Sequence, residues 1–258
     1  MGIRQQELDA RTCEVEVNIK EYRASSFEEL HRLFRAYRSH HGLGWFFRGH
    51  ADASWSILAR AGRAGFSNGL DFGRFNVWRE QALAHGPLPE NEWECLAVAQ
   101  HHGLATRLLD WTLNPLVAAF FAVTELPCRD GAVICHFPST GFVDPTIAPI
   151  KSLKVVAAYL PRAVNERISR QAGVFTVHPD PSVELAIEEC EEPLAGPNVV
   201  RIVIPAESKA PLEQVLGDYG VRFDTLFPGL DGLSRQVNRE TANLVARGEV
   251  RAPSSEGK

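Results

Sequence analysis

The stretch QHHGLATRLLDWT at residues 100–112 decides how the rest of this chain is interpreted. It is followed by Asn114, a favoured N-cap, and by Pro115, a favoured first residue of a helix. Together they predict a helix over residues 116–123, where every side chain is apolar. Because a helix that is apolar all round has no face suited to water, we expect this helix to be buried.

The segment before this stretch predicts a second helix, from about residue 90 to residue 102. Gly103 ends it, because glycine readily adopts the left-handed conformation that closes many helices. Residues 104–112 are then expected to link the two helices and to carry most of the polar side chains of interest.

Hydrophobic periodicity predicts further elements without a regular alternation of helices and strands. Ser26 and Glu29 form a capping-box pattern, which opens a helix with an apolar stripe from Phe27 to Tyr37. The remaining strands are expected at residues 13–20, 45–50, 132–137, 173–177 and 199–204, and the remaining helices at residues 71–84, 162–170, 209–216 and 233–246. Residues 153–160 are apolar but of ambiguous type. The mixture indicates an α+β fold, a single domain whose central antiparallel or mixed sheet has flanking helices.

The composition is that of a folded chain. Its 258 residues are 45% hydrophobic and 23% charged, and we expect an N-terminal extension at 1–24, one domain at 25–246 and a flexible tail at 247–258. The net charge of −5 argues against a protein that coats nucleic acid non-specifically. The five cysteines are scattered and form no CxxC pair, which predicts reduced thiols. The sequence also has no signal core and no long apolar run, so we expect a cytoplasmic protein.

Arg48 is the first candidate site residue. In the strand expected at 45–50 it shares a face with Phe46. A guanidinium on a buried strand needs a carboxylate, carbonyl groups or a ligand phosphate as its partner. Arg48 is therefore either half of a structural ion pair or an anchor for a phosphate or pyrophosphate, and Gly49 would let a ligand or another backbone approach closely.

The polar residues of 100–112 are the second candidate group. Adjacent His101 and His102 diverge by about 100° on a helix, which makes them poor ligands for one metal ion. Asp110 and Thr112 either satisfy the free N–H groups of the following helix or form the wall of a ligand cleft. In a cleft, Asp110 would repel an anion and favour a ribose hydroxyl or a positively charged ring.

Other signals carry less chemistry. Gln171 and His178 flank the strand at 173–177, where they are expected to be a polar strand start and a surface histidine. The acidic run at 188–192 is typical of a solvated face. The sequence contains no glycine-rich phosphate loop and no GxSxG motif.

The motifs resemble those of the FRG domain family. Phe47-Arg48-Gly49, followed by residues 55–60, resembles the opening of that family, and residues 100–122 resemble its central motif. Residues 171–176 and 226–232 resemble its later motifs, so that the resemblance covers roughly residues 25–235. The family occurs in bacteria and phages, and some members lie near defence or toxin genes.

The same residues also resemble ADP-ribosyltransferases of the arginine–serine–glutamate type, which would make the fold ADP-ribosyltransferase-like. Arg48 matches their arginine on an early strand, and Asp110-Trp111-Thr112 is similar to their Ser-Thr-Ser strand, with Thr112 on the last serine. Gln171 is the best positional candidate for their glutamate. A neutral glutamine would stabilise an oxocarbenium ion poorly, so we hypothesise that Asp110 supplies the missing negative charge.

These resemblances imply an NAD-consuming enzyme, a transferase or a glycohydrolase, acting in bacterial defence or toxin systems. Arg48 would bind the pyrophosphate, Thr112 would position the ribose of the nicotinamide half, and a histidine would act as acid or base. The expected catalytic residues are Arg48, Asp110, Thr112, Gln171 and His102, and the expected cofactor-binding residues are Arg48, Gly49, His101, Thr106, Arg107 and Trp111. NAD is the expected substrate, no metal or membrane is expected, and a protein or a nucleic acid would accept the transferred group.

Two other functions stay open at this point. The polar cluster would equally serve a non-catalytic module that binds a nucleotide or nucleic acid. A hydrolase or nuclease using Asp110 with His101 or His102 is the third reading, although the chain lacks paired carboxylates at short spacing.

Overall fold

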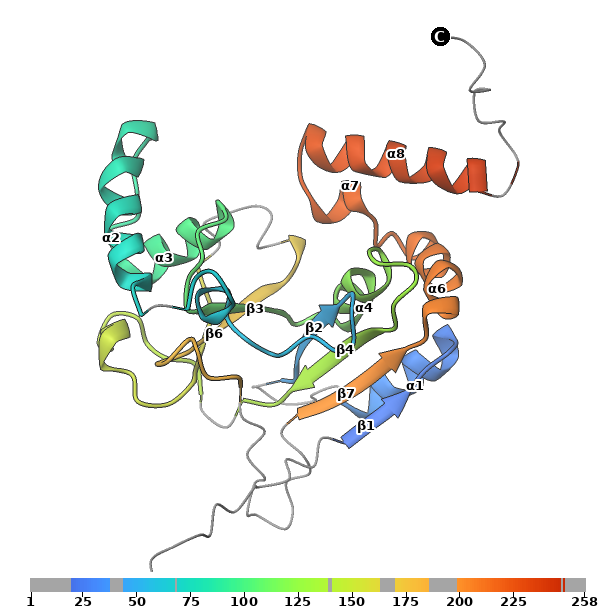
Figure 1. Cartoon of the computed structure of the whole chain (residues 1–258), viewed down its shortest axis with the longest axis horizontal. Coiled ribbons are helices and arrows are strands. Elements are labelled where there is room, and N and C mark those ends of the chain that lie inside the picture. The colour runs from blue at the N-terminus through green and yellow to red at the C-terminus, as the bar shows by residue number, and fades with distance from the viewer. Residues whose placement is uncertain are drawn as a thin grey trace, which may run out of the picture.

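A single sheet organises the molecule. The computed structural model describes residues 20–37, 44–67, 69–138, 141–162, 170–185, 199–246 and 248. Its seven strands lie in the order β1-β7-β4-β2-β3-β6-β5 (Figure 1). β1 runs parallel to β7, and the other neighbouring strands are antiparallel. The expected α+β fold with a mixed central sheet is confirmed.

The strands expected in the second half of the chain and around Arg48 are confirmed. The observed strands are β1 Lys20–Arg23, β2 Phe46–His50, β3 Leu108–Thr112, β4 Gly131–His136, β5 Ala157–Tyr159, β6 Gly173–Val177 and β7 Val199–Ile204. β5 resolves the ambiguous segment at 153–160. The expected strand at 13–20, the helix at 162–170, the acidic run at 188–192 and the tail at 247–258 lie wholly or largely outside the described residues.

The expectation of a link over residues 104–112 is wrong, because β3 occupies its second half. β3 pairs with β6 along its whole length and with β2 at Phe47. The hydrophobic periodicity does not mark this strand, because Leu108, Leu109 and Trp111 are all buried although they point to both faces of the sheet. A strand that is covered on both faces does not alternate between apolar and polar residues.

The capping residues and the glycine stop that the sequence predicts at helix ends are found in the structure. The helices are α1 Phe27–Ala36, α2 Asp71–Ala82, α3 Glu92–His101, α4 Pro115–Val123, α6 Ala206–Asp218, α7 Phe223–Leu226 and α8 Leu230–Ala246. Ser26 Oγ accepts a hydrogen bond from the backbone N–H of Glu29 at 3.2 Å, and Asn114 Oδ1 accepts one from Leu116 at 3.0 Å. Gly103 has a φ of +90°, the left-handed conformation expected at the end of α3.

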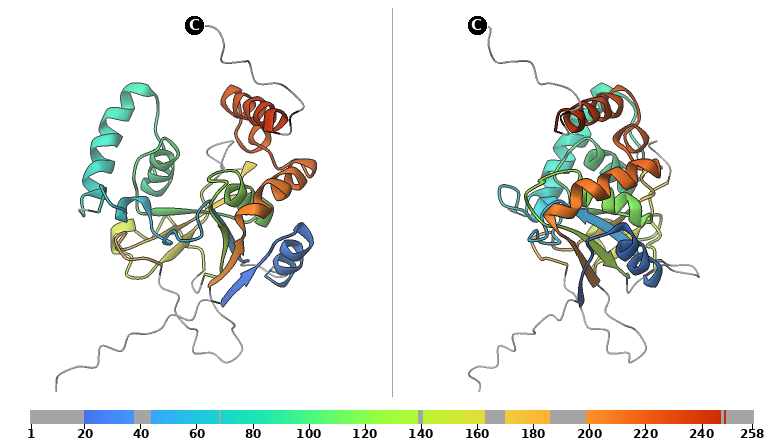
Figure 2. Two further views of the ribbon diagram at one scale, coloured as in Figure 1. Left: turned by 45° about the vertical axis from the view of Figure 1, so that its right-hand side comes forward. Right: turned by 90° about the vertical axis from the view of Figure 1, so that its right-hand side faces the viewer.

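Two groups of helices stand on one face of the sheet. α1, α4 and α6 share a hydrophobic cluster with Phe47 and Val133, and α2 and α3 share a second cluster with Leu108 and Phe175. Figure 2 shows the two groups on either side of the middle of the sheet. Phe47 lies opposite Thr112, and paired residues point to the same face, so both groups cover the same side. β2 and β3 therefore lie under the junction between the two groups.

α4 lies directly on β2. A Cβ atom added at Gly49 would stand 2.1 Å from the carbonyl oxygen of Ala118 and 2.7 Å from the backbone nitrogen of Ala122. The close approach that Gly49 was expected to allow is thus the approach of a helix backbone. This contact fixes α4 over the strand that carries Arg48.

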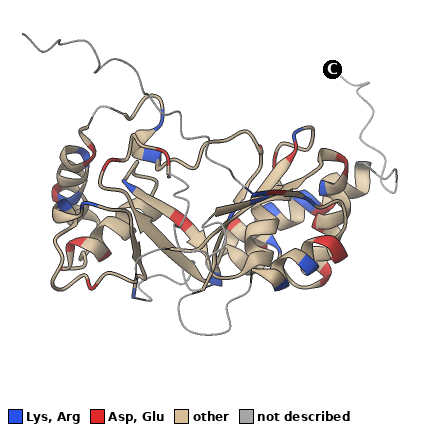
Figure 3. Ribbon diagram, turned by 90° about the horizontal axis from the view of Figure 1, so that it is seen from below, with Lys and Arg blue, Asp and Glu red and all other residues tan. Residues whose placement is uncertain are grey.

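The other face of the sheet carries a third cluster, in which Ile57 and Leu185 cover Phe46, Trp111 and Ile134. Within the described ranges, no helix combines the length and apolarity needed to cross a bilayer. Seen from below, the helices at both ends of the molecule carry Lys and Arg as well as Asp and Glu (Figure 3).

Candidate functional site

A cavity of about 350 Å³ is lined by residues of α3 and α4, by the middle of β2 and by the end of β3. The structure brings seven of the expected site residues to its wall: Arg48, Gly49, His101, Asp110, Trp111, Thr112 and Gln171. The other lining residues are Phe47, Ala51, Trp55, Ala97, Gln100, Val117, Phe121, Glu125 and Phe175. His102, Thr106 and Arg107 are not part of the lining.

The sheet splits beside this cavity. β2 and β3 pair only at Phe47 and Thr112, whereas β2 continues along β4 to His50 and β3 continues along β6 to Leu108. Arg48 bridges the split, because its Nη1 donates a hydrogen bond to the backbone oxygen of Asp110 at 2.7 Å. The guanidinium therefore satisfies a carbonyl group that β2 leaves unpaired.

Arg48 uses only part of its hydrogen-bonding capacity within the described residues. Its Nε donates to Nε2 of His50 at 3.1 Å, and its Nη2 has no partner among the described residues. The side chain is 18% exposed. Burial lowers the pKa of Arg48 and the Asp110 carboxylate raises it, and an arginine stays charged under such shifts. Burial and then the Arg48 charge lower the pKa of His50 to about 3, so that His50 is a neutral acceptor.

Asp110 and Arg48 do not form a sealed ion pair. Oδ2 of Asp110 lies 4.0 Å from Nη1 of Arg48, and 63% of the Asp110 side chain is exposed. The cap of α4 is supplied by Asn114. Of the two readings of Asp110, the structure favours the wall of a cleft, with a carboxylate accessible from solvent.

Comparison with family models identifies the domain to which this site belongs. Residues 44–130 match the model of the FRG domain. The chain contains an FRG domain. The match runs from just before β2 to just before β4, so it includes Arg48, Asp110 and Thr112, whereas Gln171 lies beyond it. No curated protein and no solved structure matches the chain.

Thr112 and Gln171 connect the segments that form one wall of the cavity. Thr112 Oγ1 donates to the backbone oxygen of Gln171 at 2.6 Å and accepts from the backbone N–H of Asn114 at 3.0 Å. Gln171 Nε2 donates to the backbone oxygen of Leu226 at 3.2 Å. The Thr112 hydroxyl, expected to position a ribose, is thus engaged in joining β3, the turn before β6 and α4.

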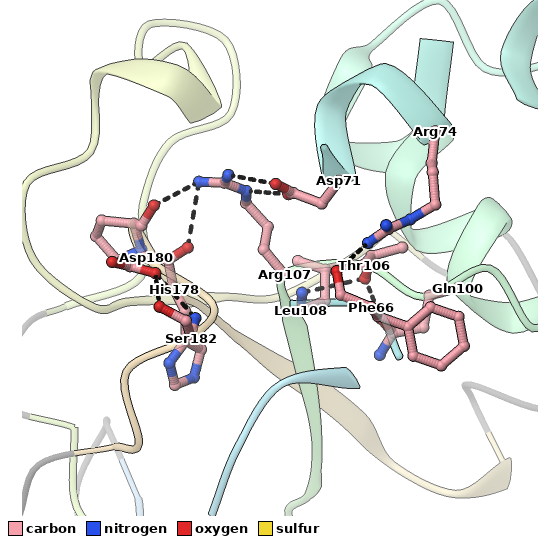
Figure 4. A network of polar contacts seen from close by, with 11 residues as sticks. Phe66, Asp71, Arg74, Gln100, Thr106, Arg107, Leu108, His178, Asp180 and Ser182 are labelled. Carbon is pink, nitrogen blue, oxygen red and sulfur yellow. Dashed lines mark hydrogen bonds and ion pairs between the residues drawn. The ribbon is translucent and has the colours of Figure 1, made fainter. Parts of the chain in front are cut away.

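Arg107 is the centre of a buried network outside the cavity (Figure 4). Its Nε and Nη2 donate to the two carboxylate oxygens of Asp71, at 2.8 and 3.1 Å. Its Nη1 donates to the backbone oxygen of Pro179 at 2.7 Å, and its guanidinium carbon lies 4.0 Å from the centre of the Phe72 ring. Arg107 therefore anchors α2 to the start of β3, a different place from the cofactor site expected of it.

Thr106 and His102 also lie apart from the cavity. The Thr106 hydroxyl is hydrogen-bonded to the side chain of Gln100 and accepts from the backbone N–H of Leu108 at 3.1 Å (Figure 4). It thereby ties α3 to β3. His102 is an exposed residue at the C-terminal end of α3, while its neighbour His101 lines the cavity.

The indole ring of Trp111 is hydrogen-bonded to a buried chain of polar side chains. Trp111 Nε1 donates to Thr176 Oγ1 at 2.9 Å, and that oxygen lies 3.1 Å from Nε2 of His178. The expectation that His178 is a surface residue is wrong, because it is 1% exposed. Burial, followed by the charge of neighbouring basic groups, lowers the pKa of His178 to about 4.

Several lining residues escaped the sequence analysis. Trp55 is 43% exposed beside the cavity, and Glu125 contributes an exposed carboxylate from just beyond α4. Trp55 belongs to the FRG-like opening at 55–60, which was a usable signal, but no local pattern marks Glu125. The described parts of the chain contain no group of three or more His, Cys, Asp and Glu side chains arranged to hold a metal ion.

Proposed function

We propose that this FRG-domain protein binds NAD in the cavity between α3 and α4 and cleaves the bond between nicotinamide and ribose, as an ADP-ribosyltransferase or an NAD glycohydrolase. The observation that carries the proposal is the position of Arg48 in the split of the sheet. Its Nη2 has no partner among the described residues, and a charged guanidinium suits an anionic pyrophosphate. The cavity volume of about 350 Å³ falls in the range of small-molecule sites.

The chemistry needs a negative charge near the ribose. When the bond between C1′ and the ring nitrogen breaks, its electron pair goes to nicotinamide, and positive charge develops on the ribose. Asp110 is the exposed carboxylate closest to Arg48, and we assign it to stabilise that charge. A water molecule or an acceptor group then forms the new bond at C1′ and loses its proton, for which Asp110 or His101 is the base.

The test is the release of nicotinamide from NAD by the purified protein. Arg48→Lys retains a positive charge but loses the planar guanidinium, which bonds His50 and the Asp110 carbonyl while it presents Nη2 to the ligand, so we expect it to reduce the rate strongly. We expect Asp110→Asn to reduce the rate strongly as well. Arg23→Lys is the matched control, because Arg23 forms an exposed ion pair with Asp130 in a different part of the sheet. Each variant is first shown to be folded by thermal unfolding. No release by the wild type, or equal release by Arg48→Lys, rejects the enzymatic proposal.

A non-catalytic nucleotide-binding module is the second candidate. Two observations favour it: the Thr112 hydroxyl is engaged with the backbone, and position 171 carries glutamine rather than glutamate. In that case the protein binds ADP-ribose or NAD through Arg48 and releases no nicotinamide.

The wider setting remains part of the proposal. We propose that residues 25–246 act as one domain, which is supported by a single sheet that draws strands from both halves of the chain. A role in bacterial defence or toxin systems, and transfer to a protein or nucleic-acid acceptor, rest on the family resemblance alone.

A further inference from the structure

Trp55 is an unusual residue for the edge of a cavity. It lines the same space as Arg48 and Asp110, yet 43% of it is exposed. Its backbone N–H donates to the carbonyl oxygen of Asp52 at 3.2 Å, and its ring centre lies 6.0 Å from the ring centre of His50. A tryptophan fixed at its backbone and left partly uncovered offers a flat apolar surface on which a planar ring can stack.

The carboxylates that line the cavity would attract a cation at this surface. Among the described lining residues, the carboxylates of Asp110 and Glu125 outnumber the single guanidinium of Arg48. His50, next to Trp55, is neutral at pH 7 because its pKa is lowered to about 3. A cation above an aromatic face is attracted by the electron-rich ring, and the two carboxylates add to that attraction.

We propose that Trp55 is the stacking platform for a flat cationic ring, and that the cavity therefore selects the oxidised, positively charged nicotinamide ring over the neutral dihydronicotinamide ring. Arg48 holds the anionic pyrophosphate, while Trp55, Asp110 and Glu125 receive the cationic end of the same ligand. This inference rests on the proposed function and deepens it, because it states which redox form of the dinucleotide the site accepts.

The experiment separates the two ends of the ligand. 1-Methylnicotinamide is a cation without a glycosidic bond to cleave, nicotinamide is its neutral counterpart, and ADP-ribose has the pyrophosphate but no nicotinamide ring. Binding of each probe is measured by ligand-observed NMR. We expect the wild type to bind 1-methylnicotinamide about fivefold or more tightly than nicotinamide. ADP-ribose binding should depend on Arg48 and change less than about twofold when Trp55 is replaced, since ADP-ribose lacks the nicotinamide ring that is proposed to stack on Trp55.

The variants assign the effect to individual side chains. Trp55→Leu should abolish binding of both nicotinamide probes, and Trp55→Phe should restore part of it. Asp110→Asn and Glu125→Gln should each reduce the preference for the cation without reducing nicotinamide binding. Tyr219→Leu is the matched control, because Tyr219 is 65% exposed and lies outside the cavity, and it should change nothing.

The outcomes are distinguishable. Equal affinities for the two nicotinamide probes, or unchanged binding by Trp55→Leu, overturn the inference even if ADP-ribose binds through Arg48. Failure of ADP-ribose to bind, with a cation preference that still depends on Trp55, supports the ring site and overturns the proposed function.

Discussion

Replacing Asp71 tests whether the Arg107 network is structural. In Asp71→Ala the guanidinium of Arg107 loses both carboxylate bonds while it stays buried, since the side chains are 9% and 6% exposed. Breaking a buried ion pair on one side costs about 3–5 kcal/mol. The bond to the Pro179 carbonyl and the contact with Phe72 persist, so we expect a loss near the lower value, about 3 kcal/mol. At about 2–4 °C per kcal/mol for a chain of this size, the melting temperature should fall by about 6–12 °C.

Urea and thermal unfolding measure this loss directly. The double variant Asp71→Leu/Arg107→Met removes both charges, so it should be more stable than Asp71→Ala. Asp110→Asn alters an exposed carboxylate and should change the free energy of unfolding by less than about 0.5 kcal/mol. A loss below about 1 kcal/mol in Asp71→Ala would refute the reasoning, because such a value is typical of a surface ion pair.

Three further predictions concern the frame around the cavity. Gly49→Ala should destabilise the protein by about 3 kcal/mol or more, because the new Cβ would lie 2.1 Å from the Ala118 carbonyl oxygen. Chemical unfolding measures this loss, and an unchanged free energy of unfolding would contradict the close contact between α4 and β2. Lys209→Met removes the buried ammonium that donates to three backbone carbonyls, so the free energy of unfolding should fall by about 2–3 kcal/mol. An unchanged free energy of unfolding would mean that these bonds do not stabilise the fold. Stability should fall with acidification, because His50 and His178 have native pKa values of about 3 and about 4, below the ordinary 6.5. Their neutral forms stabilise the fold fully above pH 6.5, and this stability is lost as the pH falls towards 4 and 3, since the unfolded chain binds the protons first. Unfolding titrations between pH 7 and pH 4 check the sign, and variants with Gln at both positions should show a flatter profile.

Local chemistry predicted much of the fold. The Ser26 and Asn114 caps and the Gly103 stop depend on residues a few positions apart, and each is found as predicted. β3 was missed for the opposite reason. Its strand conformation depends on β2 and β6, whose paired residues are about 60 to 70 positions away in the sequence, and its burial on both faces removes the alternation that would mark it.

The site was predictable as a set of residues but not as an arrangement. The sequence predicts that Arg48 needs a partner, and in the structure that partner is the backbone carbonyl of Asp110. This carbonyl is available because the sheet splits between β2 and β3, and no local sequence pattern predicts such a split. Arg107 shares a motif with Asp110, yet it lies just before β3 begins, and its side chain is bound to Asp71 outside the cavity. Glu125, just beyond the end of α4, also lines the cavity, although no local pattern marks it.

A crystal structure with ADP-ribose bound tests the central claim most directly. The account predicts a pyrophosphate oxygen within hydrogen-bond distance of Arg48 Nη2, with the terminal ribose beside the Asp110 carboxylate in the cavity between α3 and α4. ADP-ribose bound elsewhere, or in this cavity without contact to Arg48, would contradict it.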